Sequence, residues 1–287
     1  MKLGNAHKAE VELGQRRLAV LIDADNAQPS VIEGLLAEIA RFGIASVKRI
    51  YGDWTSVHHA QWKKSLLKHS ISPVQQFAYT TGKNATDSSL IIDAMDLMYT
   101  RRFDGFCLVS SDSDFTRLAQ RLREEGLTVY GFGEKKTPAP FVVACDKFVY
   151  TEVLRPEPKG EPSPTTAEPP KATSPKAKSP KPQGDKAQAP AKLEAKAKPE
   201  PPEKLAFPQE LLRLAIDEAT DESGWAQLGN VGMYLTKIRP DFDPRLYGHK
   251  KLSDLLRKYP QSYQLEERGV NKVIYVRAGG PSTTSPA

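Results

Sequence analysis

The sequence of 287 residues lacks the features that mark secreted and membrane-spanning proteins. It contains two cysteines, Cys107 and Cys145, and both sit in apolar runs. One pair cannot staple a chain of this length, so we expect a reducing, cytoplasmic environment. No apolar run approaches the roughly 18 residues of a membrane-spanning helix, and the first residues lack the apolar core of a signal peptide. We therefore expect no membrane association.

Neither acidic nor basic residues dominate. Lys and Arg number 41 and Asp and Glu number 35, which leaves a net charge of +6. This mild excess permits a polyanionic partner without establishing one. The hydrophobic content of 39% is slightly low for a chain that folds throughout, so we expect part of the chain to remain unfolded. No cluster of cysteine and histidine has zinc-binding spacing, which disfavours zinc.

The segment 155–204 has a different composition from the rest of the chain. It holds 13 of the 23 prolines, no aromatic residue and one large aliphatic residue, Leu193. Such a segment cannot bury enough apolar area to offset the entropy of ordering it, so we expect a disordered Pro/Lys/Ala-rich linker. Proline favours extended backbone, which makes the linker semi-rigid. The chain thus divides into a domain at 16–154, the linker at 155–204, a second domain at 205–278 and a disordered tail at 279–287.

The first domain alternates strand-like and helix-like runs. We expect strands at 17–23, 46–54, 71–79, 127–133 and 147–154, a strand followed by a turn at 105–114, and helices at 29–43, 57–70, 85–101 and 114–126. Continuous apolar strands that alternate with helices predict an α/β fold, in which helices cover both faces of a parallel sheet. Sites in such sheets form beyond the carboxyl ends of the strands, near the point where the strand order reverses.

Four aspartates fall at that edge of the predicted sheet. Asp23 closes the strand at 17–23, and Asp112 and Asp114 lie in the turn that closes the strand beginning at 105. Asp87 opens the helix at 85–101 with its side chain on the apolar face. Four close carboxylates would repel one another, and Mg²⁺ or Mn²⁺ relieves that repulsion. A metal ion held in this way can activate water for phosphodiester cleavage. We therefore predict a catalytic metal site formed by the four aspartates.

Each aspartate also has a simpler interpretation. Asp112 or Asp114 could cap the helix that follows, and Asp87 could stabilise the amino end of its own helix through the helix dipole. Asp23 ends an apolar strand without opening a helix directly, so capping does not account for it. We favour the metal site because all four side chains meet at one predicted edge. On the same helical wheel, Asp93 lies at the border of the apolar stripe and Asp96 faces outward.

These motifs resemble those of NYN domains, which belong to the PIN-like superfamily of Mg²⁺-dependent nucleases. The matching motifs are the strand end LIDADN, the helix opening KNATD and the turn SSDSDF, and the resemblance covers 16–154. It implies an αβα sandwich and, in many members, endoribonuclease activity. The resemblance assigns Asp23, Asp87, Asp112 and Asp114 to the acidic metal-binding positions, Asn26 to the asparagine after the first acid, and Ser110 and Ser111 to small residues that line the site.

Basic residues near the site offer contacts for phosphates. Lys63 and Lys64 lie on the outer face of the helix at 57–70, opposite an inner stripe that includes Trp62, and Lys83 lies in the loop before Asp87. We predict that these lysines contact RNA, although an ordinary solvated helix face explains the pattern of Lys63 and Lys64 equally well.

The second domain reads as three helical runs followed by a hairpin, 262–267 and 272–277, around the turn RGVN. Helices followed by a small hairpin are typical of a winged helix-turn-helix. Leu252, Leu255, Leu256 and Tyr259 have the spacing of a helix face that packs on a core.

This region resembles the LOTUS domain, also called OST-HTH. The residues that carry the resemblance are Gly224–Trp225, Leu228–Asn230, Arg239–Arg245, Tyr247–Gly248 and Lys251–Leu252. The resemblance implies binding of RNA, with structured guanine-rich RNA among the proposed ligands, or docking of a helicase partner. The net charge over 205–277 is 11 basic minus 10 acidic residues, or +1, so RNA contact must be local, and we place it around His249, Lys250 and Lys251. A role in binding protein alone stays open.

The sequence as a whole favours a metal-dependent endoribonuclease whose second domain selects or tethers RNA. Two alternatives remain. A haloacid-dehalogenase-like phosphatase would use Asp23 as its nucleophile, but the lysine motif expected of such enzymes is not evident. A non-catalytic RNA-binding adaptor would keep the acidic residues without turnover.

Overall fold

The computed structural model describes residues 16–77, 85–155 and 207–279. Their hydrophobic cores are separate, and 16–155 and 207–279 are called here the first and the second unit. Lys83, most of the predicted linker and most of the predicted tail lie outside the described residues, so the expectations for them stay predictions, as do the exact domain bounds. Within the described ranges, every helix is too short or too polar to cross a lipid bilayer.

The first unit is built on a six-stranded parallel sheet with the strand order β3-β2-β1-β4-β5-β6. The strands are β1 (Arg17–Asp23), β2 (Ile44–Gly52), β3 (Ser72–Gln75), β4 (Gly105–Val109), β5 (Thr128–Gly133) and β6 (Lys147–Tyr150). Side chains on β1 alternate between the two faces of the sheet: Leu18, Val20 and Ile22 pack into one core cluster, and Ala19 and Leu21 pack into the other. All five are fully buried, which explains why the strand reads as a continuous apolar run.

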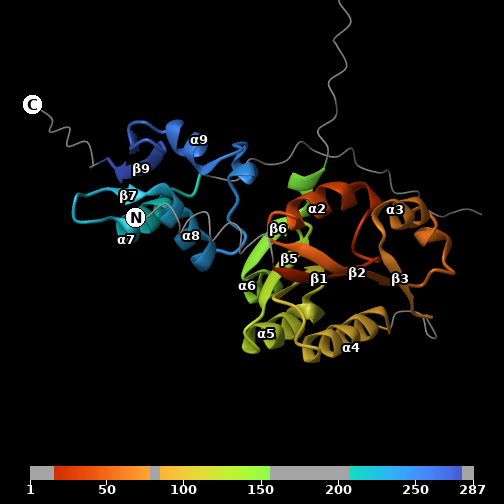
Figure 1. Ribbon diagram of the computed structural model, residues 1–287. Coiled ribbons are helices and arrows are strands. Elements are labelled where there is room, and N and C mark those ends of the chain that lie inside the picture. Colours follow the sequence, from red (N-terminus) through yellow and green to blue (C-terminus); the bar gives the residue numbers. More distant parts are fainter. Residues whose placement is uncertain (1–15, 78–84, 156–206, 280–287) are drawn as a thin grey trace, which may run out of the picture. The chain divides into compact units, whose positions relative to one another are not determined.

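Helices cover both faces of this sheet, as Figure 1 shows. On one face lie α2 (Ile32–Ile39) and α3 (Trp62–His69), and on the other lie α4 (Ala85–Tyr99), α5 (Thr116–Glu124) and α6 (Ala139–Ala144). Short 3-10 helices, η1 (Pro29–Val31), η2 (Val57–His59), η3 (Ser113–Phe115) and η4 (Thr151–Leu154), lead into or follow these elements. The predicted αβα sandwich with a parallel sheet is confirmed.

The strand order reverses between β1 and β4, and this reversal places the site. The chain builds β2 and β3 on one side of β1, and then returns to build β4, β5 and β6 on the other. β1 and β4 are parallel neighbours, with Ile22 paired to Val109, so the residues that follow these two strands emerge side by side. Asp23 and the turn 110–114 therefore meet at one edge of the sheet, as expected for a topological switch point.

Two predicted strands are shorter than expected, and one helix was not predicted. The predicted strand at 147–154 ends at Tyr150, because the chain turns there into η4. The strand predicted at 71–79 is short, since β3 pairs with β2 only from Ser72 to Gln75. Helix α6 was not predicted: its six residues, APFVVA, lack the polar face that would mark helical periodicity.

The second unit packs three helices on a small antiparallel sheet. The helices are α7 (Gln209–Ala219), α8 (Leu228–Ile238) and α9 (Leu252–Arg257), with the 3-10 helix η5 (Pro244–Tyr247), and the strands β7 (Ala226–Gln227), β8 (Tyr263–Arg268) and β9 (Val273–Ala278) have the order β7-β9-β8. Leu255 and Leu256 are buried, and Leu252 and Tyr259 pack against the same core cluster. The helices and the terminal hairpin follow the prediction, and β7 adds a third strand that the sequence pattern did not indicate.

Candidate active site

Asp23 lies at the base of the candidate site. As the last residue of β1, it is completely buried, with an exposed fraction of 0%. Its Oδ2 accepts hydrogen bonds from Asn26 Nδ2 at 2.7 Å and from Ser110 Oγ at 2.8 Å, and its Oδ1 accepts one from the backbone N–H of Asp25 at 3.0 Å. Burial raises the pKa of the Asp23 carboxyl, and the bonds from Asn26, Ser110 and Asp25 oppose that rise.

Ser110 links Asp23 to the acidic turn that follows β4. Its hydroxyl donates to Asp23 and accepts from the backbone N–H of Asp112 at 3.1 Å. Asp112 in turn caps η3, since its Oδ1 accepts from the backbone N–H of Asp114 at 2.9 Å. The capping role considered for Asp112 is therefore real, but it uses one oxygen and leaves Oδ2 outside the cap.

Asp87 completes the cluster from the other side of the turn. It lies in the first turn of α4, and carboxylate oxygens of Asp87, Asp112 and Asp114 all lie within 4.8 Å of one another. Asp87 and Asp112 are half-buried and Asp114 is exposed, so the three oxygens gather at a surface that a ligand can reach. Among the described residues, Asp23 is not part of this close trio but lies beneath it, joined to it by Ser110.

The electrostatics of the cluster reflect its crowding. Burial, together with the negative charges of Asp23, Asp112, Asp114 and Asp25, raises the pKa of Asp87 to about 6. These carboxylates come from three separate segments of the chain, so the repulsion between them is a product of the fold and not of local sequence. A cation placed among the three oxygens would lower that repulsion.

The other predicted site residues have distinct places. Asn26 contacts Asp23 directly. Ser111 is buried and points away from the trio, because its Oγ accepts from the backbone N–H of Glu134 at 2.8 Å and so joins the turn to the end of β5. Lys63 and Lys64 are exposed on α3, and their neighbour Trp62 is buried against the sheet. In the second unit, Lys250 and Lys251 are exposed and His249 is half-buried.

One pair near the site was not identified from the sequence. The Nε2 of His59 lies 3.2 Å from Asp25 Oδ1, and its Nδ1 donates to the backbone carbonyl of Asp53 at 2.9 Å. The imidazole is buried, so it holds Asp25 in place beside the acidic cluster. The sequence carries the adjacent histidines His58 and His59, but adjacency alone gives no sign of which one reaches Asp25.

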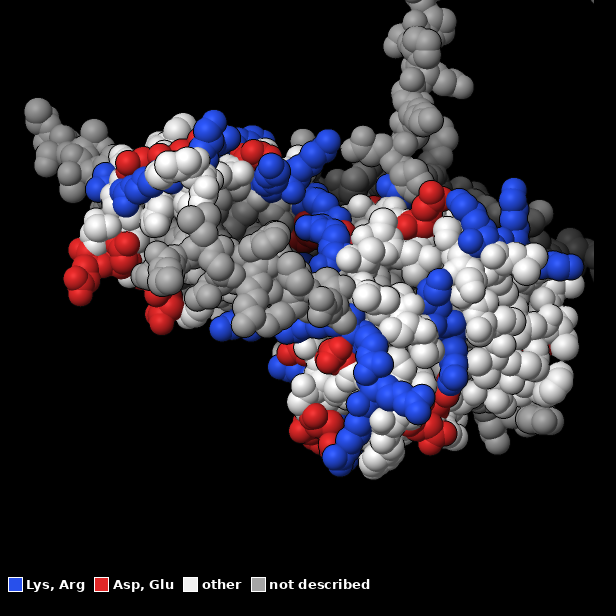
Figure 2. Space-filling model, in the orientation of Figure 1, with Lys and Arg blue, Asp and Glu red and all other residues white. Residues whose placement is uncertain are grey.

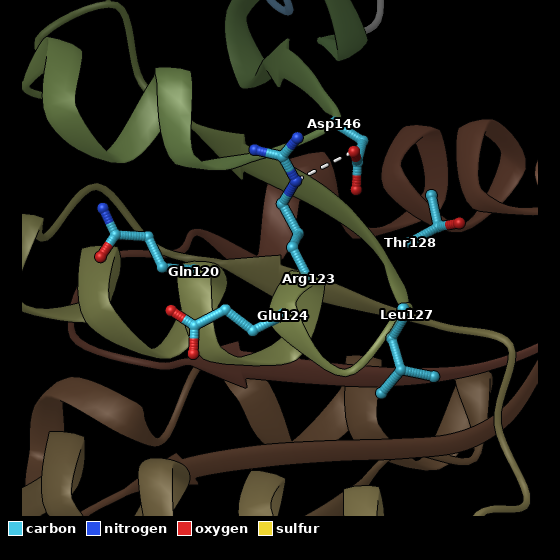
Figure 3. Close-up of a pocket in the computed structure, with 7 residues that line it drawn as sticks. Gln120, Arg123, Glu124, Leu127, Thr128 and Asp146 are labelled. Atoms are coloured by element: carbon cyan, nitrogen blue, oxygen red, sulfur yellow. Dashed lines mark ion pairs between the residues drawn. The ribbon is translucent and has the colours of Figure 1, made fainter.

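The hollow shown in Figure 3 is separate from the acidic cluster. It has a volume of about 720 Å³ and lies by the amino end of β5, where Arg123 pairs with Asp146 at 3.0 Å. The acidic cluster lies at the opposite, carboxyl end of the strands. On the face shown in Figure 2, acidic and basic side chains are interspersed over the first unit and do not form one broad basic surface.

Comparison with known families agrees with this geometry. The family model described as NYN domain matches residues 17–152, and the model described as OST-HTH/LOTUS domain matches residues 200–275. The chain carries an NYN domain followed by an OST-HTH domain. The acidic cluster lies in the NYN domain, and the three-stranded sheet of the second unit lies in the OST-HTH domain.

Three solved structures are similar to parts of this chain. A solution NMR structure of an uncharacterized protein from Nitrosomonas europaea is 38% identical, and the match covers 35% of this chain and 99% of that chain with a TM-score of 0.28. A crystal structure of a protein of unknown function from Vibrio parahaemolyticus is 18% identical, with coverages of 47% and 93% and a TM-score of 0.41. A solution NMR structure from Chromobacterium violaceum is 36% identical, with coverages of 28% and 88% and a TM-score of 0.23. Comparison with curated proteins gives no match.

Proposed function

We propose that the protein is a metal-dependent endoribonuclease, in which the NYN domain cleaves RNA phosphodiesters and the OST-HTH domain binds the RNA. The observation that carries the proposal is the convergence of Asp87, Asp112 and Asp114 at the strand-order reversal, above the buried Asp23. RNA is the partner in this proposal. Binding of a protein partner is a second possible role of the OST-HTH domain. The cysteine pattern supports a cytoplasmic setting.

The donor set fits a hard divalent cation. All three converging groups are carboxylates, and Mg²⁺ or Mn²⁺ prefers such oxygen ligands while retaining several waters. Asp87, Asp112 and Asp114 would hold the ion, and Asp23 would add negative charge from below. When bound, such an ion activates water and stabilises the charge that develops on the leaving oxygen of a phosphodiester.

The residues of the chain itself have separate tasks in this proposal. Ser110 fixes Asp112 relative to Asp23, and Asn26 fixes Asp23 within the loop, so the carboxylates are positioned before substrate arrives. Lys63 and Lys64 are exposed on α3 and are proposed to contact RNA phosphates. Lys83 has the same proposed role from its place in the sequence, although it lies outside the described residues.

The phosphatase alternative receives no support from the geometry of Asp23. A nucleophilic carboxylate must reach the phosphorus atom of its substrate, but Asp23 has an exposed fraction of 0% and accepts three hydrogen bonds. The buried position instead suits a group that tunes and supports its neighbours.

Cleavage of labelled single-stranded RNA by the full-length protein tests the proposal. We expect products with Mg²⁺ or Mn²⁺ and none after removal of the metal with EDTA. Asp112→Asn should lower the cleavage rate by about a hundredfold or more, the scale on which loss of one charge-stabilising group lowers kcat. Asparagine can still accept the capping bond from Asp114, so the turn should keep its conformation while it loses the charge.

Asp96→Asn is the matched control, because it replaces the same carboxylate with the same amide on the exposed face of α4. It should cleave RNA at the rate of the unaltered protein. Equal cleavage by the Asp112→Asn variant would remove the acidic cluster from the chemistry. Tight RNA binding without products under Mn²⁺ would favour the non-catalytic adaptor.

A further inference from the structure

The outward face of the small sheet in the OST-HTH domain carries aromatic and arginine side chains together. On β7 and β9 the inward residues Ala226 and Val276 are opposite each other and fully buried. Their neighbours in the strands, Gln227 and Arg277, point the other way, and Trp225, which directly precedes β7, reaches the same outward face because its ring contacts Arg277. The hairpin register adds Tyr275 to the same face.

Arg268 and Arg277 stack on the aromatic rings of this face. The guanidinium of Arg268 lies 4.6 Å from the ring centre of Trp225 and 4.8 Å from that of Tyr275. The guanidinium of Arg277 lies 4.8 Å from the ring centre of Trp225. A stacked guanidinium is held in a fixed plane, and its N–H donors point outward from the edge of that plane, where they can meet an anion with little further loss of side-chain freedom.

The charge of these arginines is only partly balanced. Arg268 pairs with Glu266 at 2.9 Å. Arg277 instead contacts the neutral amide of Gln264 at 2.6 Å, and within the described part of the chain it forms no ion pair. Gln227, Gln264, Glu266 and Arg277 are exposed, so a ligand can reach the face between and above them.

We propose that this outward face, formed by Trp225, Arg268, Tyr275 and Arg277, binds single-stranded RNA. Proteins that hold single strands without strict sequence preference combine cationic groups along the backbone with aromatic rings on which bases stack, and this face offers both. The inference deepens the proposed function, because it assigns a surface to the RNA binding attributed to the OST-HTH domain. It differs from the patch predicted from sequence, His249, Lys250 and Lys251, which contains no aromatic ring.

The positive charge of this face favours RNA over a protein partner. Trp, Tyr and Arg are also enriched at protein interfaces, so the aromatic rings do not separate the two kinds of partner. The two arginines, however, share one ion-paired carboxylate, that of Glu266, which leaves positive charge for phosphates to meet. An extended single strand can place phosphates on the arginine edges while bases stack on the aromatic rings or the guanidinium planes of this face.

Fluorescence anisotropy with a dye-labelled single-stranded RNA of mixed sequence tests the inference in the full-length protein. EDTA in the buffer prevents cleavage. The double variant Arg268→Gln with Arg277→Gln should reduce the dependence of log K on log salt by about 1.4, since each phosphate contact to a single strand contributes about 0.7. Tyr275→Leu should weaken binding about tenfold, the scale of one base stacked on an aromatic ring.

Three controls make the result specific. Arg213→Gln removes the same charge from the exposed side of α7, away from this face, and should leave the salt dependence unchanged. Lys250→Gln with Lys251→Gln tests the patch predicted from sequence. Circular dichroism and thermal unfolding of each variant verify that the fold is retained.

The outcomes separate this inference from the proposed function. If the unaltered protein binds and cleaves RNA while the sheet-face variants bind it equally well, the inference is overturned and the nuclease proposal stands. If binding falls only in the Lys250 and Lys251 variant, the RNA site is elsewhere in the domain. If the unaltered protein binds RNA but never cleaves it, the nuclease proposal is contradicted. The inference about the binding face is then still decided by the sheet-face variants.

Discussion

Among individual side chains, Asp87 has the most strongly perturbed ionisation in the acidic cluster. Its pKa rises from 3.8 to about 6 because the carboxylate is partly buried and faces other carboxylates. The folded protein therefore binds this proton more tightly than the unfolded chain does. It follows that Asp87 lowers the free energy of unfolding as pH rises from about 4 to about 6, and that this cost persists above that range.

The substitution Asp87→Asn should remove this pH-dependent cost in the metal-free protein. Relative to the unaltered protein, we expect the variant to gain about 1 kcal/mol more at about pH 8 than at about pH 4, after allowing for solvent screening of a half-exposed group. Urea unfolding in EDTA at the two pH values measures the difference. For Asp96→Asn, the change in the free energy of unfolding should be the same at both pH values. If the change for Asp87→Asn is also the same at both pH values, the cluster does not perturb the pKa of Asp87.

Individual roles in the site differ in how far the sequence could reveal them. Asp23 ends an apolar strand, Asp112 follows another, and Asp87 lies in the first turn of an apolar helix, so their meeting follows from the order of the strands and helices. That Asp23 lies beneath the trio depends on side-chain bonds to Asn26 and Ser110, which no spacing rule encodes. The contact between His59 and Asp25 is equally invisible, because it depends on the path of the loop after β2.

Between secondary-structure elements, Asp93 ties α4 to the sheet. It accepts hydrogen bonds from Arg49 and from the buried Tyr51, both on β2. Burial and the neighbouring Asp93 raise the pKa of Tyr51, so its hydroxyl stays a donor. Since α4 also carries Asp87, this link fixes the helix that brings one carboxylate to the site.

We expect Asp93→Asn to destabilise the protein by about 1–2 kcal/mol, because it weakens two bonds and leaves the Arg49 charge without its partner. Urea unfolding at neutral pH measures the effect. Asp96→Asn, three residues further along α4 and exposed, should change stability by less than about 0.5 kcal/mol. Similar small effects for both variants would mean that α4 is held by its apolar face alone.

The elements that the sequence pattern missed are the short ones. Long apolar runs such as β1 and the amphipathic α5 are visible from periodicity, because many residues repeat the same signal. The two residues of β7 form a strand only because β9 supplies a partner, and α6 has too few residues to display a helical period. Their conformations are decided by tertiary contacts, which local sequence does not contain.

Across the full chain, the NYN and OST-HTH domains each have a hydrophobic core of their own. The sequence between them predicts an extended, Pro-rich spacer that keeps bound RNA near the nuclease. Separating the two domains at this spacer, and supplying both halves together, should therefore lower cleavage of dilute RNA on the order of a hundredfold. The ratio kcat/KM of the intact and divided proteins measures this, and equal values would show that the OST-HTH domain does not deliver substrate.

Cation binding by the acidic cluster is best measured by the electron paramagnetic resonance signal of free Mn²⁺ during titration with protein. We expect the full-length protein and Asp96→Asn to remove Mn²⁺ from solution, and Asp112→Asn to do so far more weakly. Equal uptake of Mn²⁺ by Asp112→Asn and the unaltered protein, or no uptake by either, would contradict the metal site formed by Asp87, Asp112 and Asp114.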